Sequence, residues 1–391
     1  MRRFATDFSL SAATAGFVAV LVGFTSSVAI VFQAAQAFGA TPAEQASWMW
    51  ALGLGMGLCT LLPSLAWRQP AMVAWSTPGA AVLATSAAGY GMSDAIAAFM
   101  LSGALILLFG MTGWFERVMS RIPVAIASAL LAGVLARFGI DAFAAARSAL
   151  PLVLLMLASY LVARRLWPRY AIPSVLLLAT VFVAWRGELR VDAIAWSLAS
   201  PVFTAPRFSV EGAISLALPL FIVTMASQNL PGVAAIRAAG FGAMPISRLI
   251  SITGAATLLL APFGAFALNL SAITAAIVMG REAHEDPRRR YVASAVCGAI
   301  YVAIGLVGGA VIGLLNAFPR ELVVAIAGFA LLGTIGNALA AALKDEAHRE
   351  AALVTFLVTL SGVVIAGVGA AFWAVVAGAL ALALQPRPAR G

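Results

Sequence analysis

The stretch "VAWSTPGAAVLATSAAG", residues 73–89, places a Ser-Thr-Pro-Gly cluster inside an apolar run long enough to lie in a membrane. Serine or threonine before proline is a typical helix start, because proline suits the first helical turn and the hydroxyl can cap it. We therefore expect residues 71–76 to be extended and a helix to cover about 78–89, beginning in mid-membrane. A continuous span kinked at Pro78 is the alternative.

The composition excludes a soluble protein. Of the 391 residues, 63% are hydrophobic and only 10% are charged, whereas a soluble domain carries about 25% charged residues. The chain is therefore predicted to be an all-α polytopic protein with the lipid bilayer as its partner. The formal charge of +9 indicates arginine-rich cytoplasmic loops rather than a nucleic-acid partner.

Apolar runs separated by charged residues, proline or glycine predict about 14 transmembrane segments. The first is predicted to be a retained span rather than a cleaved signal peptide. With the N-terminus inside, most of the 24 lysines and arginines fall on the cytoplasmic side, so both termini are predicted to be cytoplasmic. A short interfacial helix is expected at about 191–198. The predicted spans are 9–36, 46–66, 70–89, 95–114, 121–140, 148–164, 170–186, 213–240, 246–262, 264–280, 289–315, 321–343, 350–365 and 368–386.

An internal repeat relates the two halves. "QAAQAFGATP" (33–42) closes the first span and "IRAAGFGAMP" (236–245) closes the eighth, with the same alanine, Phe-Gly-Ala and proline positions. Seven spans in each half force the second half to enter from the opposite side. We therefore predict 7+7 inverted repeats at 1–186 and 213–391 joined by a linker at 187–212, an architecture typical of secondary transporters.

The tenth span, "APFGAFALNLSAITAAIVMG" (261–280), has a matching break. We expect Asn269 to cap a helix that starts near Leu270, although a hydrogen bond between helices is an alternative role for Asn269. Two half-helix N-termini would then face each other at the midplane and bind an anion without lysine or arginine. Ser76, Thr77, Asn269 and Leu270 are the predicted substrate-binding residues of these spans.

Two further polar clusters lie inside spans, in "VGFTSSVAIVFQ" (22–33) and "VTMASQNLPG" (223–232). Buried amides and hydroxyls are costly without partners, so they line a cavity or lock helices together. Phe24 and Phe266 are candidates for an apolar wall, and Ser27 and Ser227 are interpreted as packing residues. The predicted substrate-binding residues from the two clusters are Thr25, Ser26, Gln33, Gln228 and Asn229.

No carboxylate lies near the middle of any predicted span. Arg137 is expected to snorkel outward and to pair with Asp141. Cys59 and Cys297 are interpreted as inert packing residues, and His284 and His348 as solvated loop residues. Since no HExxH motif or intramembrane acid is present, we predict no enzyme, catalytic residue, metal or cofactor.

Three stretches make the chain closely resemble the BenE-type benzoate/proton symporter family of bacterial inner membranes: residues 7–57, "WSTPGAAVLATS" (75–86) and "MASQNLPGVAAIRAAGF" (225–241). The resemblance implies a fold similar to uracil permeases and sulfate permeases. It implies a core domain (about 9–114 and 213–315), a gate domain (about 121–186 and 321–386), broken third and tenth spans, and a homodimer as one assembly.

The function that this resemblance implies is proton-coupled uptake of benzoate or a related aromatic carboxylate by alternating access. A nucleobase or inorganic-anion carrier of the same fold is the alternative. Uracil-type carriers place glutamates in the eighth and tenth spans, where this chain has Gln228, Asn229 and Asn269. The proton is therefore expected to travel on the substrate, or on a carboxylate at a segment end such as Asp94, Glu116 or Asp141.

Overall fold

Helices dominate the computed structural model, which describes residues 6–25, 27–115, 123–167, 171–190, 198–281, 283–365 and 370–384. Nine helical segments of this described part are long and apolar enough to cross a membrane. The interfacial helix expected at about 191–198 lies almost wholly outside the described residues.

The first half of the chain begins with a divided span. The predicted single helix over 9–36 consists of two helices, with Ser27 in the turn between them. The described elements of this half are α2 (Leu10–Thr25), α3 (Val28–Ala37), α4 (Pro42–Trp67), β1 (Val73–Trp75), α5 (Thr77–Ser86), α6 (Met92–Thr112), α8 (Val124–Ala144), α9 (Ala146–Leu166) and α10 (Ala171–Trp185).

The second half contains π-helical turns within its first span and a second short strand. The main elements are α11 (Val210–Gly212), η3 (Ala213–Ala217), α12 (Leu218–Thr224), η4 (Met225–Asn229), α13 (Leu230–Ala238), α14 (Ile246–Leu260), β2 (Leu268–Leu270), α15 (Ile273–Met279), α16 (Tyr291–Leu306), α17 (Gly308–Ala317), α18 (Arg320–Leu343), α19 (Arg349–Ser361) and α20 (Ala370–Leu384). Single 3₁₀ turns are η5 (Ala261–Phe263), η6 (Pro287–Arg289) and η7 (Glu346–His348).

The predicted break in the third span is confirmed. Residues Val73–Trp75 are a strand, and α5 begins at Thr77, directly after Ser76. The helix ends at Ser86 rather than near residue 89, where the positive φ of Gly89 turns the chain. This span therefore starts its helix in the interior of the protein.

The predicted helix start in the tenth span is wrong. Asn269 lies in β2, which pairs antiparallel with β1, and α15 starts only at Ile273. The Ser271 N–H extends this ladder by donating to the Met72 carbonyl at 3.1 Å. Pairing keeps the segment extended because buried backbone groups need partners where water is absent.

The ladder also separates the two helix starts. At one end the Ser76 N–H donates to the Ala267 carbonyl, and at the other Ser271 bonds to Met72. The four residue steps from Met72 to Ser76 span about 13 Å at the rise of a strand. The half-helices therefore begin at opposite ends of the ladder instead of meeting at one point.

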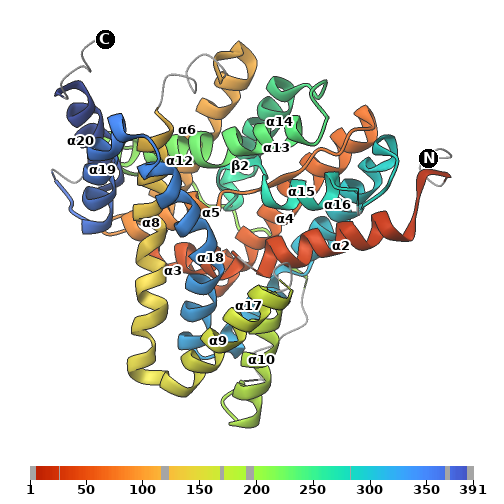
Figure 1. Ribbon diagram of the computed structural model, residues 1–391, viewed down its shortest axis with the longest axis horizontal. Helices are drawn as coiled ribbons and strands as arrows, with labels where there is room; N and C mark the ends of the chain where they lie inside the picture. Colours follow the sequence, from red (N-terminus) through yellow and green to blue (C-terminus); the bar gives the residue numbers. More distant parts are fainter. Residues whose placement is uncertain are drawn as a thin grey trace.

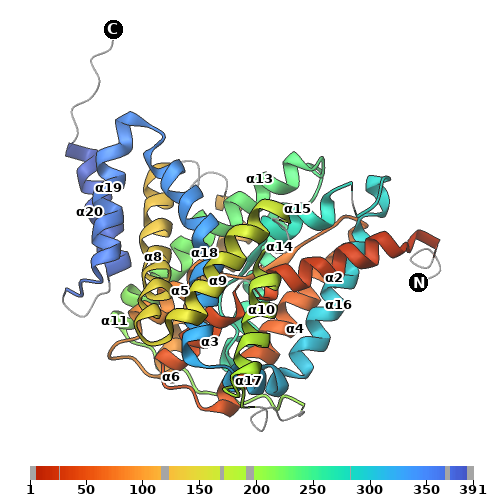
Figure 2. The same cartoon turned by 60° about the horizontal axis from the view of Figure 1, so that its bottom comes forward.

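Helices from the two halves pack in pairs, and α4 and α14 also contact the ladder. Helix α4 packs on α16, α6 on α14, and α8 on α18. Glycines permit the first contact, since a Cβ on Gly57 would lie 2.7 Å from the Gly298 carbonyl oxygen. In both views α19 and α20 lie beside α8 on one side, and α2, α4 and α16 lie on the other (Figure 1 and Figure 2).

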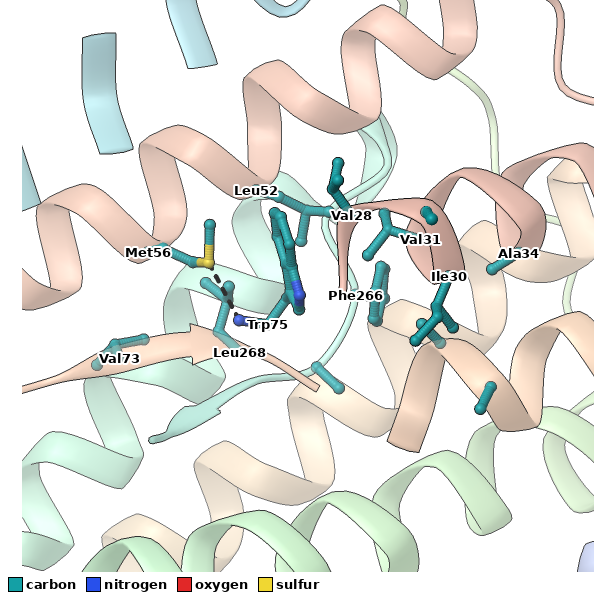
Figure 3. Packing of buried hydrophobic residues seen from close by; sticks show 14 of the residues in the cluster. Val28, Ile30, Val31, Ala34, Leu52, Met56, Val73, Trp75, Phe266 and Leu268 are labelled. Atoms are coloured by element: carbon teal, nitrogen blue, oxygen red, sulfur yellow. Dashed lines mark hydrogen bonds between the residues drawn. The ribbon is translucent and has the colours of Figure 1, made fainter. Parts of the chain in front are cut away.

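One face of the ladder belongs to the hydrophobic core. Val73, Trp75 and Leu268 point into a cluster with Leu52 and Met56 (Figure 3). The Trp75 backbone N–H donates to the Met56 sulfur at 3.1 Å. Because side chains alternate along a strand, Ala74 and Asn269 lie on the opposite face.

Candidate functional site

The second face of the ladder carries the polar residue of the tenth span. Asn269 is fully buried and lies directly across from Ala74, which is partly exposed. The Asn269 Nδ2 donates to the Ala267 carbonyl at 3.2 Å. Within the described part of the chain, Asn269 Oδ1 accepts no hydrogen bond. This face therefore presents an open acceptor.

Ser76 caps α5 as the sequence predicts. Its hydroxyl accepts the Gly79 N–H at 3.0 Å and is contacted by Thr224 Oγ1, which donates at 2.8 Å. Thr77 follows as the first helical residue and is partly exposed. Thr224 is a functional candidate that sequence reasoning passed over, although it belongs to the same polar cluster as Gln228.

Gln228 and Asn229 lie in the π-helical turn η4, a distortion frequent at functional sites. Asn229 is fully buried; its Oδ1 accepts the Leu270 N–H at 2.8 Å and its Nδ2 donates to the Met225 sulfur at 3.0 Å. Of the two roles that the sequence left open, Asn229 therefore has the one that holds spans together. The Leu270 N–H is already bonded to Asn229 and is not free for a ligand. Gln228 is partly exposed.

The first span contributes Gln33 and supports Trp75. The Trp75 Nε1 donates to Ser27 Oγ at 2.8 Å, and the Phe24 and Trp75 ring centroids lie 5.4 Å apart. Ser27 therefore orients a core tryptophan. The predicted residue Ser26 and the side chain of Thr25 lie outside the described residues.

Phe266 does not form a wall for a ligand. Its side chain is fully buried, and its ring centroid lies 5.8 Å from those of Trp48 and Phe99. These three rings pack against one another, so Phe266 belongs to the core. Figure 3 shows Phe266 among the buried hydrophobic residues.

A large open cavity of about 1220 Å³ lies between α3, α5, α8 and α18. We call it the vestibule. Gln33 lines it, and its Nε2 has no hydrogen-bond partner among the described residues. Both signs of charge face the vestibule, and the lining includes Phe32, Gln36, Ala84, Asp141, Ser148, Glu188, Arg190, Phe318, Arg320 and Glu321.

Helix α5 connects the vestibule with the ladder. Ala84 lines the vestibule, and Thr77 lies seven residues before it on the same face of the helix. The intervening Ala80 and Ala81 are fully buried. Helix α5 therefore leads from the vestibule to its cap Ser76 beside the ladder.

The segment-end carboxylates differ in their surroundings. Asp94 is 3% exposed and forms a bidentate pair with Arg207, at 2.8 Å to Nε and 2.7 Å to Nη2. This hydrogen bond raises the pKa of the Arg207 guanidinium and anchors the linker to α6. Asp141 faces the vestibule, whereas Glu116 lies outside the described residues.

Arg137 does not pair with Asp141, contrary to expectation. Its guanidinium lies against Gly362, where a Cβ would be 2.6 Å from Nη1, at the C-terminal end of α19. With Thr85, Ser86 and Thr359 it lines a small cavity of about 20 Å³. A helix C-terminus attracts a cation, which accounts for this position.

The remaining candidates for chemistry have local roles. Cys59 and Cys297 are free and buried. His284 accepts the Asp286 N–H, and His348 lies 2.6 Å from Asp345, where this contact lowers the pKa of the Asp345 carboxyl. The described residues contain no group of three or more His, Cys, Asp or Glu side chains placed to hold a metal ion.

A family model described as benzoate membrane transport protein matches residues 6–384. Inner membrane protein YdcO of Escherichia coli (strain K12) is 46% identical over 364 residues and covers 93% of each chain. The benzoate membrane transport protein of Acinetobacter baylyi is 36% identical over 382 residues, covering 98% of this chain and 97% of the relative. The transmembrane domain of a cyanobacterial bicarbonate transporter, BicA, matches with a TM-score of 0.59 over 95% and 97% of the two chains at 15% identity, which indicates a shared fold.

Proposed function

We propose, from the premise that this chain belongs to the BenE benzoate membrane transport family, that it imports benzoate or a related aromatic carboxylate together with a proton. The chain is a multi-pass membrane transporter of the bacterial inner membrane rather than an enzyme. The substrate and the proton coupling are the proposed part.

The proposed architecture has 14 spans in 7+7 inverted repeats, with the repeat, core and gate boundaries predicted from the sequence. Packing supports this arrangement. In that scheme α4 and α14 are equivalent second spans, and α6 and α16 are equivalent fourth spans. An inverted repeat requires α4–α16 and α14–α6 to be equivalent contacts, and both pairs are packed closely. The strands β1 and β2 are also equivalent in this scheme, and their antiparallel pairing is consistent with the same two-fold relationship between the repeats.

The proposed site is the polar face of the ladder together with the start of α5. The observation that carries the proposal is that Ser76, Thr77 and Asn269 gather there, where two spans are non-helical and α12–η4 fixes both of them. Such backbone is tolerated at membrane depth only in a protein-lined interior. Gln228 and Gln33 supply further polar groups, and Thr25 and Ser26 remain proposed site residues. Leu270 also remains a proposed site residue, although its N–H is bonded to Asn229 and its side chain alternates onto the core face with Leu268.

The vestibule is the proposed outer access route. If both termini are cytoplasmic, then the end of α3, the α8–α9 junction and the start of α18 all lie on the periplasmic side. Those segments line the vestibule. The structure would then correspond to a state that is open outward above an occluded site.

Transport by the purified protein in proteoliposomes tests the proposed function. An inward proton gradient should drive accumulation of labelled benzoate, with competition by other aromatic acids. Labelled uracil and bicarbonate serve as the alternative substrates. Accumulation of either one, with no response to benzoate, would assign the chain to a different substrate class.

A further inference from the structure

The side-chain amide of Asn269 leaves its oxygen, and not its nitrogen, without a hydrogen bond, and the neighbouring backbone fixes this orientation. Asn269 Nδ2 donates to the Ala267 carbonyl, so reversing the amide would bring two oxygens together. Oδ1 is therefore the atom without a hydrogen bond among the described residues, in a side chain that is fully buried. A buried acceptor of this kind requires a donor.

The surroundings offer little compensation for a negative charge. At the start of α5, Ser76 Oγ takes the Gly79 N–H, the Ser76 carbonyl takes the Ala80 N–H, and Pro78 has no N–H. Among the described residues, the Thr77 N–H is therefore the donor of the first turn that remains without an acceptor. The nearest cation along α5 is Arg137 beside Thr85, eight residues beyond Thr77 and about 12 Å away by helix rise.

The open acceptor and the open donor belong to residues that are close neighbours on and beside the ladder. Asn269 lies across from Ala74, and Ser76 is the next residue on that face, in a diagonal position roughly 7–8 Å from Asn269. Thr77 directly follows Ser76. A carboxyl group with two hydrogen bonds of about 2.8 Å each can bridge such a separation.

We infer that the aromatic acid is bound in its neutral form, with its O–H donating to Asn269 Oδ1 and its carbonyl accepting the Thr77 N–H. This inference rests on the proposed function. A carboxylate without charge compensation neutralises in a buried site instead of remaining ionised. The anion takes one proton from water on the vestibule side, and the acid releases that proton on the other side. The proton then travels on the substrate, and no side chain has to carry it.

Binding measurements on the purified full-length protein at pH 6, 7 and 8 test the inference, with benzoate and the permanently neutral benzamide as probes. The neutral fraction of benzoate falls tenfold per pH unit above a carboxyl pKa of about 4. The benzoate Kd should therefore rise about tenfold per unit, whereas the benzamide Kd should stay constant.

A variant pair locates the acceptor. Asn269→Leu should weaken both ligands by about tenfold to a hundredfold, because each loses its hydrogen-bond acceptor. Ser102→Ala is the matched control, since it removes the hydroxyl of another fully buried polar side chain on α6 that has no partner among the described residues. Thermal unfolding of both variants reports whether they are folded.

The outcomes separate the inference from the proposed function. A benzamide Kd that also rises tenfold per pH unit assigns the proton to the protein and overturns the inference. So does a benzoate Kd that is independent of pH, or a failure of benzamide to bind. A protein that binds uracil or bicarbonate but neither aromatic ligand contradicts the proposed function itself.

Discussion

Asn229 Oδ1 accepts the backbone N–H of Leu270 at 2.8 Å, and this bond joins the eighth span to the strand of the tenth. Both groups are fully buried. Five residues earlier in the same span, Thr224 donates to the cap of α5. One span therefore holds both non-helical segments, so movement of α12–η4 would be transmitted to both sides of the ladder.

Asn229→Leu should destabilise the protein. The substitution leaves the Leu270 N–H buried without an acceptor, which costs about 1–3 kcal/mol. Gln228→Leu is the matched control, since this neighbouring amide is partly exposed; it should retain stability and lower benzoate uptake. Thermal unfolding in detergent and uptake in proteoliposomes measure the two effects. Equal melting temperatures for Asn229→Leu and wild type would contradict the locking role.

Ser76→Ala should weaken the start of α5 by about 0.5–2 kcal/mol, as expected for loss of a helix cap. It also removes the acceptor of Thr224. Ser76→Thr keeps a hydroxyl and should recover most of the stability. Thermal unfolding of the two variants provides the comparison, and identical losses in both would indicate crowding rather than capping.

Cysteine labelling should reveal the orientation of the vestibule. Ser148→Cys places a thiol in the vestibule, and Arg281→Cys places one in a separate cavity near Glu285 and Arg290. With both termini cytoplasmic, a membrane-impermeant maleimide should label the first variant in intact spheroplasts and the second only after lysis. Native Cys59 and Cys297 are buried, so their labelling should be low. The reverse pattern would invert the proposed topology.

The sequence predicted the elements that local chemistry dictates. The Ser-Thr-Pro cluster predicted the start of α5, because capping and proline geometry act within a few residues. The strand pairing of Val73–Trp75 with Leu268–Leu270 was not predicted, since it depends on two segments almost 200 residues apart and outweighs the local cap signal at Asn269. The sequence also could not predict that Asn229 is bonded while Gln228 is partly exposed. Adjacent helical residues point about 100° apart, so these two amides meet different surroundings.

The segment before α2 holds a carboxylate, Asp7, whose charge should stay constant over the pH range of transport. A hydrogen bond from Tyr291, with further contributions from Arg68 and Arg289, lowers the pKa of Asp7 from 3.8. A lowered pKa contributes stability above the unfolded value, and that contribution is lost as pH falls through the folded one. The difference in melting temperature between wild type and Asp7→Asn should be constant from pH 5 to 8 and should shrink near pH 3. A difference that changes between pH 6 and 8 would contradict this assignment.

The last prediction concerns the carboxylates that could replace the substrate as proton carrier. Asp141→Asn should leave pH-driven benzoate uptake largely intact, because the proton is proposed to travel on the acid. Asp94→Asn should lower stability only modestly, since it removes the carboxylate of a bidentate ion pair and leaves Arg207, which is 71% exposed and can be solvated. Arg207→Gln is the companion variant: it leaves the buried Asp94 carboxylate without its counter-charge, so it should cause the larger loss of stability, without changing the pH dependence of uptake. The decisive comparison is proton-driven accumulation against benzoate exchange at equal pH on both sides of the membrane. If Asp141→Asn abolishes accumulation while exchange persists, the proton has a carrier in the vestibule, and Asn269 binds the acid without deciding its protonation.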